Sequence, residues 1–294
     1  MKRIVSRLAT IGLIGVLTIA APVAAKQFSA WAAPSQVDLQ DVNTASLEGC
    51  AMQSPDGLSL YFASNRSGGE GGIDIWVAHR PSISHPWHTP ENLGPRINST
   101  SNELCPTPVR GKGLFFISAR PGACGGTDNA DIYFARLNPR HGWTAPVNLG
   151  CQVNSSADEF GPSYFEADGR AFLYFSSGPD IYASERASNG SWGSAASVTE
   201  LNSAFGDFRP NVRKDGLEIV FDSARSDTYG LQDLYTATRP SVDDPWSTPS
   251  NLGNVVNTTL SEVRASFSWD ATTLYFGRTG GLDGSMDLWV TTRD

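Results

Sequence analysis

Short apolar segments recur along the chain, and each one follows a turn that is rich in Gly, Asp or Ser. A run of three or four apolar residues between turn signals is typical of a strand and too short for a helix. The segments are residues 60–62, 114–117, 173–175, 219–221 and 274–276. After each of them, a turn leads to a second predicted strand, which opens with Asp, then Ile or Leu, then an aromatic residue. These opening residues are Asp74, Asp131, Asp180, Asp233 and Asp287.

An acidic residue precedes each apolar segment and marks the start of a repeat of 48 to 56 residues. The five acidic residues are Glu48, Glu103, Glu159, Asp207 and Glu262. Four repeats continue into a further strand that begins near Trp87, Trp143, Trp192 or Trp246. Four short strands per repeat predict one antiparallel sheet, and the period is that of a propeller blade. The blades are expected to start near residues 46, 101, 157, 205 and 260.

The fifth repeat stops at Asp294, before its fourth strand. Residues 31–44 match the segment 246–258, which forms the fourth strand of the preceding repeat and the loop after it. We therefore predict an all-β fold, a five-bladed β-propeller whose N-terminal strand completes the last blade and removes the exposed edges there. The alternative is an open row of five sheets, which would leave the N-terminal match unused.

Several motifs of the repeat resemble a known family. They are the Ser-Pro-Asp-Gly turn at 54–57, the strand at 60–62, the Ser-x-Arg motif ending at Arg66, and the strand opening at Asp74. Together they resemble the WD-like propeller repeats of TolB-like periplasmic proteins, over residues 31–294. The resemblance implies the fold and says little about function, because such propellers include scaffolds, peptidase propellers and glycan-handling proteins. Repeat three departs from the pattern, since residues 176–180 lack the Arg and shorten the turn.

The first 25 residues have the layout of a secretory signal peptide: Lys2, Arg3 and Arg7, then an apolar run at 8–21, then small residues up to Ala25. We expect cleavage after Ala25, a single domain at 26–294, a periplasmic or secreted location and no membrane insertion of the mature chain. An uncleaved anchor is the alternative, although the apolar run is short for a membrane span.

The chain has 294 residues, 40% hydrophobic and 18% charged, with a net charge of −8. This composition argues against disorder and against a nucleic-acid partner. We expect a monomer.

All four cysteines lie in the part expected to be exported, which predicts two disulfides. Cys50 and Cys105 occupy the same repeat position in neighbouring blades, and Cys124 and Cys151 are expected on one face of blade two. We therefore predict Cys50–Cys105 and Cys124–Cys151, with Cys105–Cys124 as the main alternative.

Strand one of each blade is innermost in a propeller, by the family resemblance. The five acidic residues would then ring the channel mouth, and strand alternation would point the second residue after each one the same way. This second tier contains Cys50, Cys105, Gly161, Arg209 and Arg264. The alternative is that the ring is structural, with each carboxylate accepting backbone N–H groups or pairing with Arg209 and Arg264. The repeated Asp74, Asp131, Asp233 and Asp287 are expected to cap turns and to pair with Arg66, Arg120, Arg225 and Arg278.

Two functions are compatible with these residues. In the first, a binding module holds an anionic small molecule, glycan or peptide at the mouth through Asp207, Arg209, Glu262, Arg264 and Trp269. In the second, a carbohydrate-active hydrolase or lyase uses Glu48, Glu103 and Glu159 as its acid and base. We expect no metal or other cofactor. Clustered carboxylates also suit Ca²⁺, but no Asp-x-Asp-x-Asp loop supports it.

Overall fold

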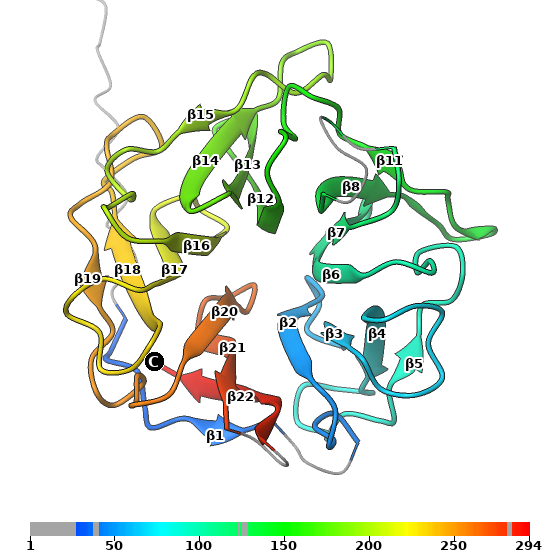
Figure 1. Ribbon diagram of the computed structural model, residues 1–294, viewed down its shortest axis with the longest axis horizontal. Coiled ribbons are helices and arrows are strands. Elements are labelled where there is room, and N and C mark those ends of the chain that lie inside the picture. Colours follow the sequence, from blue (N-terminus) through cyan, green and yellow to red (C-terminus); the bar gives the residue numbers. More distant parts are fainter. Residues whose placement is uncertain (1–27, 38–40, 123, 125–128, 281–283) are drawn as a thin grey trace, which may run out of the picture.

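The computed structural model describes residues 28–37, 41–122, 124, 129–280 and 284–294, and the predicted signal peptide lies outside these residues. Five four-stranded antiparallel sheets surround a common centre, which confirms the five-bladed β-propeller (Figure 1). No helix of the described residues is long and apolar enough to cross a membrane.

Each blade runs from an innermost strand to a short outer one. Blade one contains β2 (Glu48–Gln53), β3 (Ser59–Ser64), β4 (Asp74–His79) and β5 (Glu91–Asn92). Blade two contains β6 (Glu103–Val109), β7 (Gly113–Ser118), β8 (Asp131–Ala135) and β11 (Val147–Asn148). A separate hairpin of β9 (Leu137–Asn138) and β10 (Gly142–Trp143) lies between β8 and β11 in the sequence. Blade three contains β12 (Glu159–Ala167), β13 (Arg170–Ser177), β14 (Asp180–Glu185) and β15 (Ala196–Ser197). Blade four contains β16 (Asp207–Val212), β17 (Glu218–Ser223), β18 (Asp233–Thr238) and β19 (Ser250–Asn251). Blade five contains β20 (Glu262–Phe267), β21 (Thr273–Thr279), β22 (Met286–Thr292) and β1 (Ser35–Gln36).

The N-terminal strand closes the ring, as predicted. β1 pairs antiparallel with β22, with Ser35 opposite Val290 and Gln36 opposite Trp289, so the first and last strands share one sheet (Figure 1). The Val37 N–H donates a further hydrogen bond to the carbonyl of Leu288 at 2.9 Å. Blade five therefore has its fourth strand, and no open edge remains at this seam.

A buried or half-buried asparagine ties each fourth strand to the third strand of the same blade. Its side-chain oxygen accepts the N–H of one residue of that third strand, and its amide donates to the carbonyl of the same residue. The five pairs are Asn43 with Leu288, Asn98 with Ile75, Asn154 with Ile132, Asn202 with Ile181, and Asn257 with Leu234. Asn43 has the same bonds as its counterparts although it lies 245 residues from its partner, so the seam is built like the other blades.

Neighbouring inner strands are linked around the centre. The link between blades two and three runs from the Thr107 hydroxyl to the carbonyl of Pro162. Between blades three and four, the Val212 N–H donates to the Ser163 hydroxyl. Between blades four and five, the Phe267 N–H donates to the side-chain oxygen of Asn211. Between blades five and one, the Ser266 hydroxyl donates to the carbonyl of Ala51. Between blades one and two the Cys50–Cys105 disulfide provides the link. The second predicted disulfide, Cys124–Cys151, is also present, so both pairings are confirmed.

The apolar core lies between adjacent blades and is built from the second strands. Each second strand carries a completely buried phenylalanine at the same repeat position, namely Phe62, Phe116, Phe175, Phe221 and Phe276. This packing fixes the blades against one another and thereby the position of the inner strands, which carry the candidate site.

Candidate functional site

Every inner strand carries a β-bulge near its start. The pairing register with the second strand shifts between the second and fifth residues of each strand, for example between Gly49 and Met52. The third residue has a left-handed backbone: φ is 53° at Cys50, 48° at Cys105, 57° at Gly161, 50° at Arg209 and 60° at Arg264. This conformation costs a non-glycine residue about 1–2 kcal/mol, so the surrounding fold must hold it in place.

Because of this bulge, the prediction that the five acidic residues ring the channel mouth is wrong. Alternation along a regular strand would point each acid and the residue two positions later to one side, but a bulge breaks that alternation. The five acidic residues Glu48, Glu103, Glu159, Asp207 and Glu262 are all 0% exposed and lie within the blades, and none of them lines the central cavity. The residues at the bulge face the cavity in their place.

Each buried carboxylate has a fixed set of partners. It accepts hydrogen bonds from the backbone N–H and the hydroxyl of the residue four positions before it, for example Thr44 for Glu48. In three blades it also pairs with the arginine of the Ser-x-Arg motif at 2.9–3.0 Å: Glu48 with Arg66, Glu103 with Arg120, and Asp207 with Arg225. In blade five, which lacks this motif, Glu262 pairs at 2.6 Å with Arg278, the residue directly opposite it on the second strand. These arginines were expected to pair with the aspartates that open the third strands, and that expectation is wrong.

Three of the aspartates that open the third strands, Asp74, Asp131 and Asp233, cap turns, as expected. Asp74 accepts the N–H groups of Glu70 and Gly71, and Asp233 accepts those of Tyr229 and Gly230. An asparagine amide of the fourth strand adds a further bond, at 3.0 Å for Asp74 and Asn92. Their role in the described structure is to hold the loops between strands two and three.

Glu159 differs from the other four buried acids, because Pro179 occupies the position of the arginine in blade three. Its Oε1 accepts hydrogen bonds from Ser155 and Ser177, while its Oε2 is buried without a hydrogen-bond partner in the described part of the chain. Burial raises the pKa of Glu159 from 4.5 to about 7. The folded protein therefore keeps this carboxyl protonated over a pH range in which the unfolded chain has already lost the proton.

This difference predicts a pH-dependent stability. Because the folded state binds the additional proton between about pH 4.5 and 7, the free energy of unfolding should fall as pH rises through this window. Glu159→Gln should remove this fall and should be about 1–3 kcal/mol more stable than the wild type at pH 8, measured by urea denaturation from pH 5 to 8.

Glu48→Gln is the matched control, since Glu48 occupies the same repeat position but pairs with Arg66. It should destabilise the protein at every pH of the series, because it leaves a largely buried arginine without its carboxylate. A Glu159→Gln variant that is less stable than the wild type at pH 8 would contradict the pKa argument.

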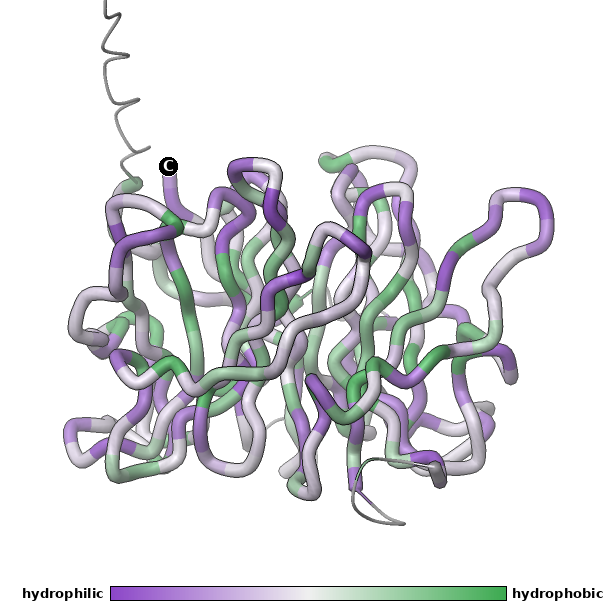
Figure 2. The backbone as a smooth tube through the Cα atoms, turned by 90° about the horizontal axis from the view of Figure 1, so that it is seen from above, coloured by the Kyte–Doolittle hydropathy of each residue, from purple (hydrophilic) through white to green (hydrophobic). Residues whose placement is uncertain are grey.

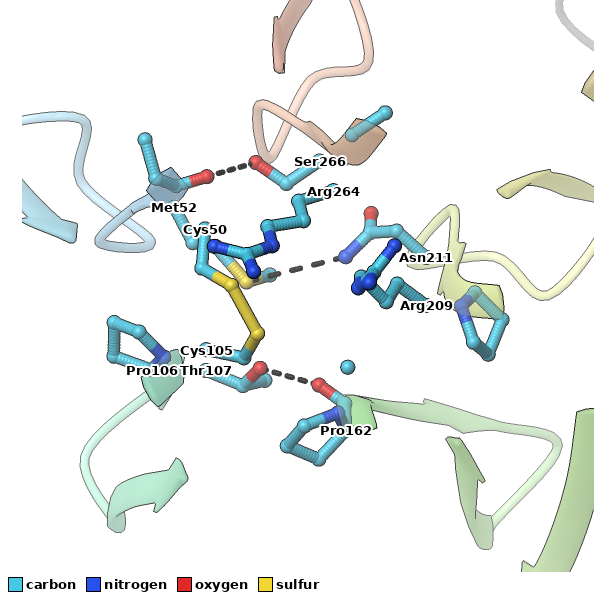
Figure 3. Close-up of a pocket in the computed structure, with 14 residues that line it drawn as sticks. Cys50, Met52, Cys105, Pro106, Thr107, Pro162, Arg209, Asn211, Arg264 and Ser266 are labelled. Atoms are coloured by element: carbon cyan, nitrogen blue, oxygen red, sulfur yellow. Dashed lines mark hydrogen bonds between the residues drawn. A yellow bond between two sulfur atoms is a disulfide. The ribbon is translucent and has the colours of Figure 1, made fainter. Parts of the chain in front are cut away.

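At the centre of the ring, two arginines share one carboxylate. Arg209 and Arg264 project from the bulges of blades four and five into a cavity of about 30 Å³, whose opposite wall includes the Cys50–Cys105 disulfide (Figure 3). Arg209 Nη1 donates to Asp222 Oδ2 at 2.5 Å, and the backbone N–H of Arg264 donates to Asp222 Oδ1 at 2.9 Å. Asp222 is completely buried.

The donors of this arginine pair are not all used. Arg209 Nε, Arg264 Nε and Arg264 Nη1 are buried and have no hydrogen-bond partner among the described residues. Burial, together with the neighbouring Arg209, lowers the pKa of Arg264 to about 10, and burial raises the pKa of Asp222. Two cations and one anion leave an excess positive charge in a site that is poorly solvated, which is an arrangement that favours an additional anion.

Asp222 was not recognised as a site residue in the sequence, although the repeat contains a signal for it. The equivalent positions in the other blades hold Ala63, Ile117, Ser176 and Gly277. Asp222 is therefore the one acidic residue at a position that is otherwise small or apolar, and it directly precedes the repeated Ser-x-Arg motif.

Trp269 lies apart from the arginine pair. It belongs to the turn between β20 and β21, at the opposite end of the inner strand from Arg264, and it lines a different hollow together with Arg110 and Lys214. The two hollows share no lining residue. Of the predicted ligand-binding residues, only Arg209 and Arg264 are therefore brought together.

No family model and no curated protein sequence matches this chain. Solved structures do match. A thermostable family-43 glycoside hydrolase has 11% identity and a TM-score of 0.57, covering 88% of this chain and 92% of that one. An alpha-L-arabinofuranosidase from Lactobacillus brevis has 12% identity and a TM-score of 0.56, covering 86% and 92%.

TolB from Acinetobacter baumannii is also among the matches, with 16% identity and a TM-score of 0.48. The match covers 83% of this chain and 53% of the TolB chain, so this protein spans about half of that length. At such low identities, these similarities show the propeller fold alone.

Proposed function

We propose that this protein is an exported binding module whose central channel holds the carboxylate, or another small anionic group, of its ligand between Arg209 and Arg264. The observation that carries the proposal is the set of buried guanidinium donors without partners. A buried charge that lacks a partner destabilises the fold, so its presence favours a role in binding. The two disulfides and the predicted signal peptide support export.

The size of the cavity limits what it can hold. A single water needs roughly 10–15 Å³ of such space, so a cavity of about 30 Å³ has room for about two oxygen atoms. A carboxylate fits, and a whole sugar ring does not. The remainder of the ligand would lie outside the cavity, with its acidic group inserted between the arginines, where charge-assisted hydrogen bonds are strong.

The hydrolase or lyase alternative receives less support from this geometry. Glycoside hydrolysis needs two carboxyl groups that face the scissile bond. The residues lining the cavity include no Asp or Glu, and the nearby Asp222 is bound by Arg209 and Arg264. Glu48 and Glu103 are held in ion pairs with arginines, away from the cavity.

Methionine at either arginine position tests the proposal, because it keeps the apolar stem and removes the guanidinium. Acetate, malonate and glucuronate are suitable probes, with binding measured by calorimetry and by the ligand-dependent rise in melting temperature. Arg264→Met and Arg209→Met should each weaken anion binding by about 1.5–3 kcal/mol.

The two variants should differ without ligand. Arg264→Met should be as stable as the wild type or more stable, since it removes a buried cation that has no carboxylate of its own. Arg209→Met should be less stable, because Asp222 loses its ion-pair partner. Arg140→Met, in the exposed β9–β10 turn, is the control. Equal affinity of all four proteins for every probe would contradict the proposal.

A further inference from the structure

A groove crosses the face of the propeller that carries the turns between strands one and two. Three hollows of about 640, 510 and 270 Å³ meet at the β6–β7 turn, and all three are lined by Val109 and Lys112. The third hollow reaches Trp269 in the β20–β21 turn, beside which the C-terminus lies, because the Arg293 N–H donates to the carbonyl of Thr272. This is the upper face in Figure 2, where the C-terminus is marked. We call these joined hollows the cationic groove.

The charge of the groove is opposite to that of the chain. Its lining contains five cationic side chains, namely Arg110, Lys112, Arg136, Arg186 and Lys214, and two acidic ones, Asp56 and Glu166. Three positive charges in excess thus gather on one face of a chain whose net charge is −8. A further hollow next to Tyr164 adds Arg170 and Asp168, which leaves the excess unchanged. Such a concentration attracts anionic ligands.

Most of these cations are not neutralised by the protein. Within the described residues, Lys112 alone of the five forms a salt bridge, with Glu166. Lys214 donates to the backbone carbonyl of Tyr164 at 2.7 Å and otherwise faces the Trp269 ring. Burial lowers the pKa of Lys214 to about 8. Its ammonium group therefore lacks a carboxylate and is poorly solvated, so an incoming anion would stabilise its charge.

Aromatic rings accompany the cations along the groove. Trp269 lies 5.2 Å from the Arg110 guanidinium and 5.1 Å from the Lys214 ammonium, measured to the ring centroid. Tyr164 has Lys112 at 5.6 Å, and Trp192 has Arg186 at 6.0 Å. Tyr164 is buried, so the groove presents two partly exposed rings, Trp192 and Trp269, each next to a cation.

This combination selects among anionic ligands. A pyranuronic acid unit carries an apolar C–H face and a carboxylate on one ring. A single unit can therefore stack its C–H face on an aromatic ring and pair its carboxylate with the neighbouring cation. An acidic peptide offers carboxylates on flexible stems without a flat apolar face, and ordering those stems costs entropy. We propose that the cationic groove binds a carboxylated oligosaccharide, with uronic acid units placed against Trp269 and Trp192 and their carboxylates on Lys214, Arg110 and Arg186.

Calorimetry with three probes tests the ligand class. Trigalacturonate should bind, and its fully methyl-esterified form should bind at least about tenfold more weakly, because esterification keeps the rings and removes the charges. Hexaglutamate should also bind at least about tenfold more weakly than trigalacturonate. Equal binding of the ester, or tighter binding of hexaglutamate, would overturn the proposal.

Variants locate the site and separate it from the central channel. Lys214→Met, Trp269→Leu and the exposed Arg110→Glu should each weaken trigalacturonate binding by about tenfold or more. Because the Arg110 side chain is exposed, Arg110→Glu should fold normally, so it keeps the test valid if one of the other two variants does not fold. Arg264→Met should change this affinity by less than about twofold, because it alters only the cavity at the centre. Loss of binding in Arg264→Met with no effect of the groove variants would contradict this second site and would support the channel.

Discussion

Removing residues 26–44 from the mature protein is expected to lower its stability by several kcal/mol or to prevent folding. The deletion takes away β1, leaves the outer edge of β22 unpaired, and exposes apolar surface that Val37 and Val42 bury. It also removes Trp31, whose ring stacks on Phe267 at 6.3 Å between centroids. Urea denaturation of the two proteins measures the difference.

A point variant keeps this test informative if the truncated chain does not fold. Asn43→Ala removes the bonds to Leu288, and Asn98→Ala removes the equivalent bonds to Ile75 inside an uninterrupted segment of chain. If the seam is built like the other blades, both variants should lose a similar amount, about 1–3 kcal/mol. A truncated protein that melts within a degree or two of the mature chain, or an Asn43→Ala variant without effect, would contradict ring closure.

Glu218→Gln is expected to destabilise the protein by about 3–5 kcal/mol. Glu218 accepts hydrogen bonds from Arg213 Nη1 and from both terminal nitrogens of Arg293, each at 2.7 Å. All three side chains are less than 10% exposed. Arg293 also lies under the rings of Phe28 and Trp31, so Glu218 of blade four holds Arg293 at the seam and, through it, these two rings.

The control for this variant is Glu185→Gln. Glu185 pairs with Arg170 at 2.7 Å, but both side chains are more than a third exposed, so its loss should change the free energy of unfolding by less than about 1 kcal/mol. Similar effects of the two substitutions in thermal or chemical denaturation would show that the Glu218 network has no special role at the seam.

The fold could be predicted from the sequence because its information is repeated five times. Turn residues, apolar segments and the Trp-containing fourth strand recur in register, and the match of residues 31–44 to the end of blade four gave the closure. The disulfides followed from the same register, since Cys50 and Cys105 occupy one repeat position.

The candidate site was harder to predict, because it depends on the bulge in the inner strands. Glycine commonly marks a left-handed residue, but only Gly161 does so here, and Cys50, Cys105, Arg209 and Arg264 occupy the same conformation in the other blades. Because the other four strands have no glycine at this position, the sequence predicts regular strand alternation, which wrongly places the buried acidic residues at the channel. Arg209 and Arg264 were identified correctly as channel residues, whereas Asp222 and the lysines near Trp269 depend on contacts between blades that a sequence does not show.

The proposed anion site can be tested directly in crystals of the mature protein soaked in bromide, because bromide gives an anomalous signal and is small enough for a cavity of about 30 Å³. The proposed function predicts an ordered bromide within hydrogen-bond distance of Arg264 Nε or Nη1 and near Arg209, and the loss of that peak in Arg264→Met crystals. A central cavity that contains no bromide in the wild type, while bromide binds elsewhere on the same protein, would contradict it.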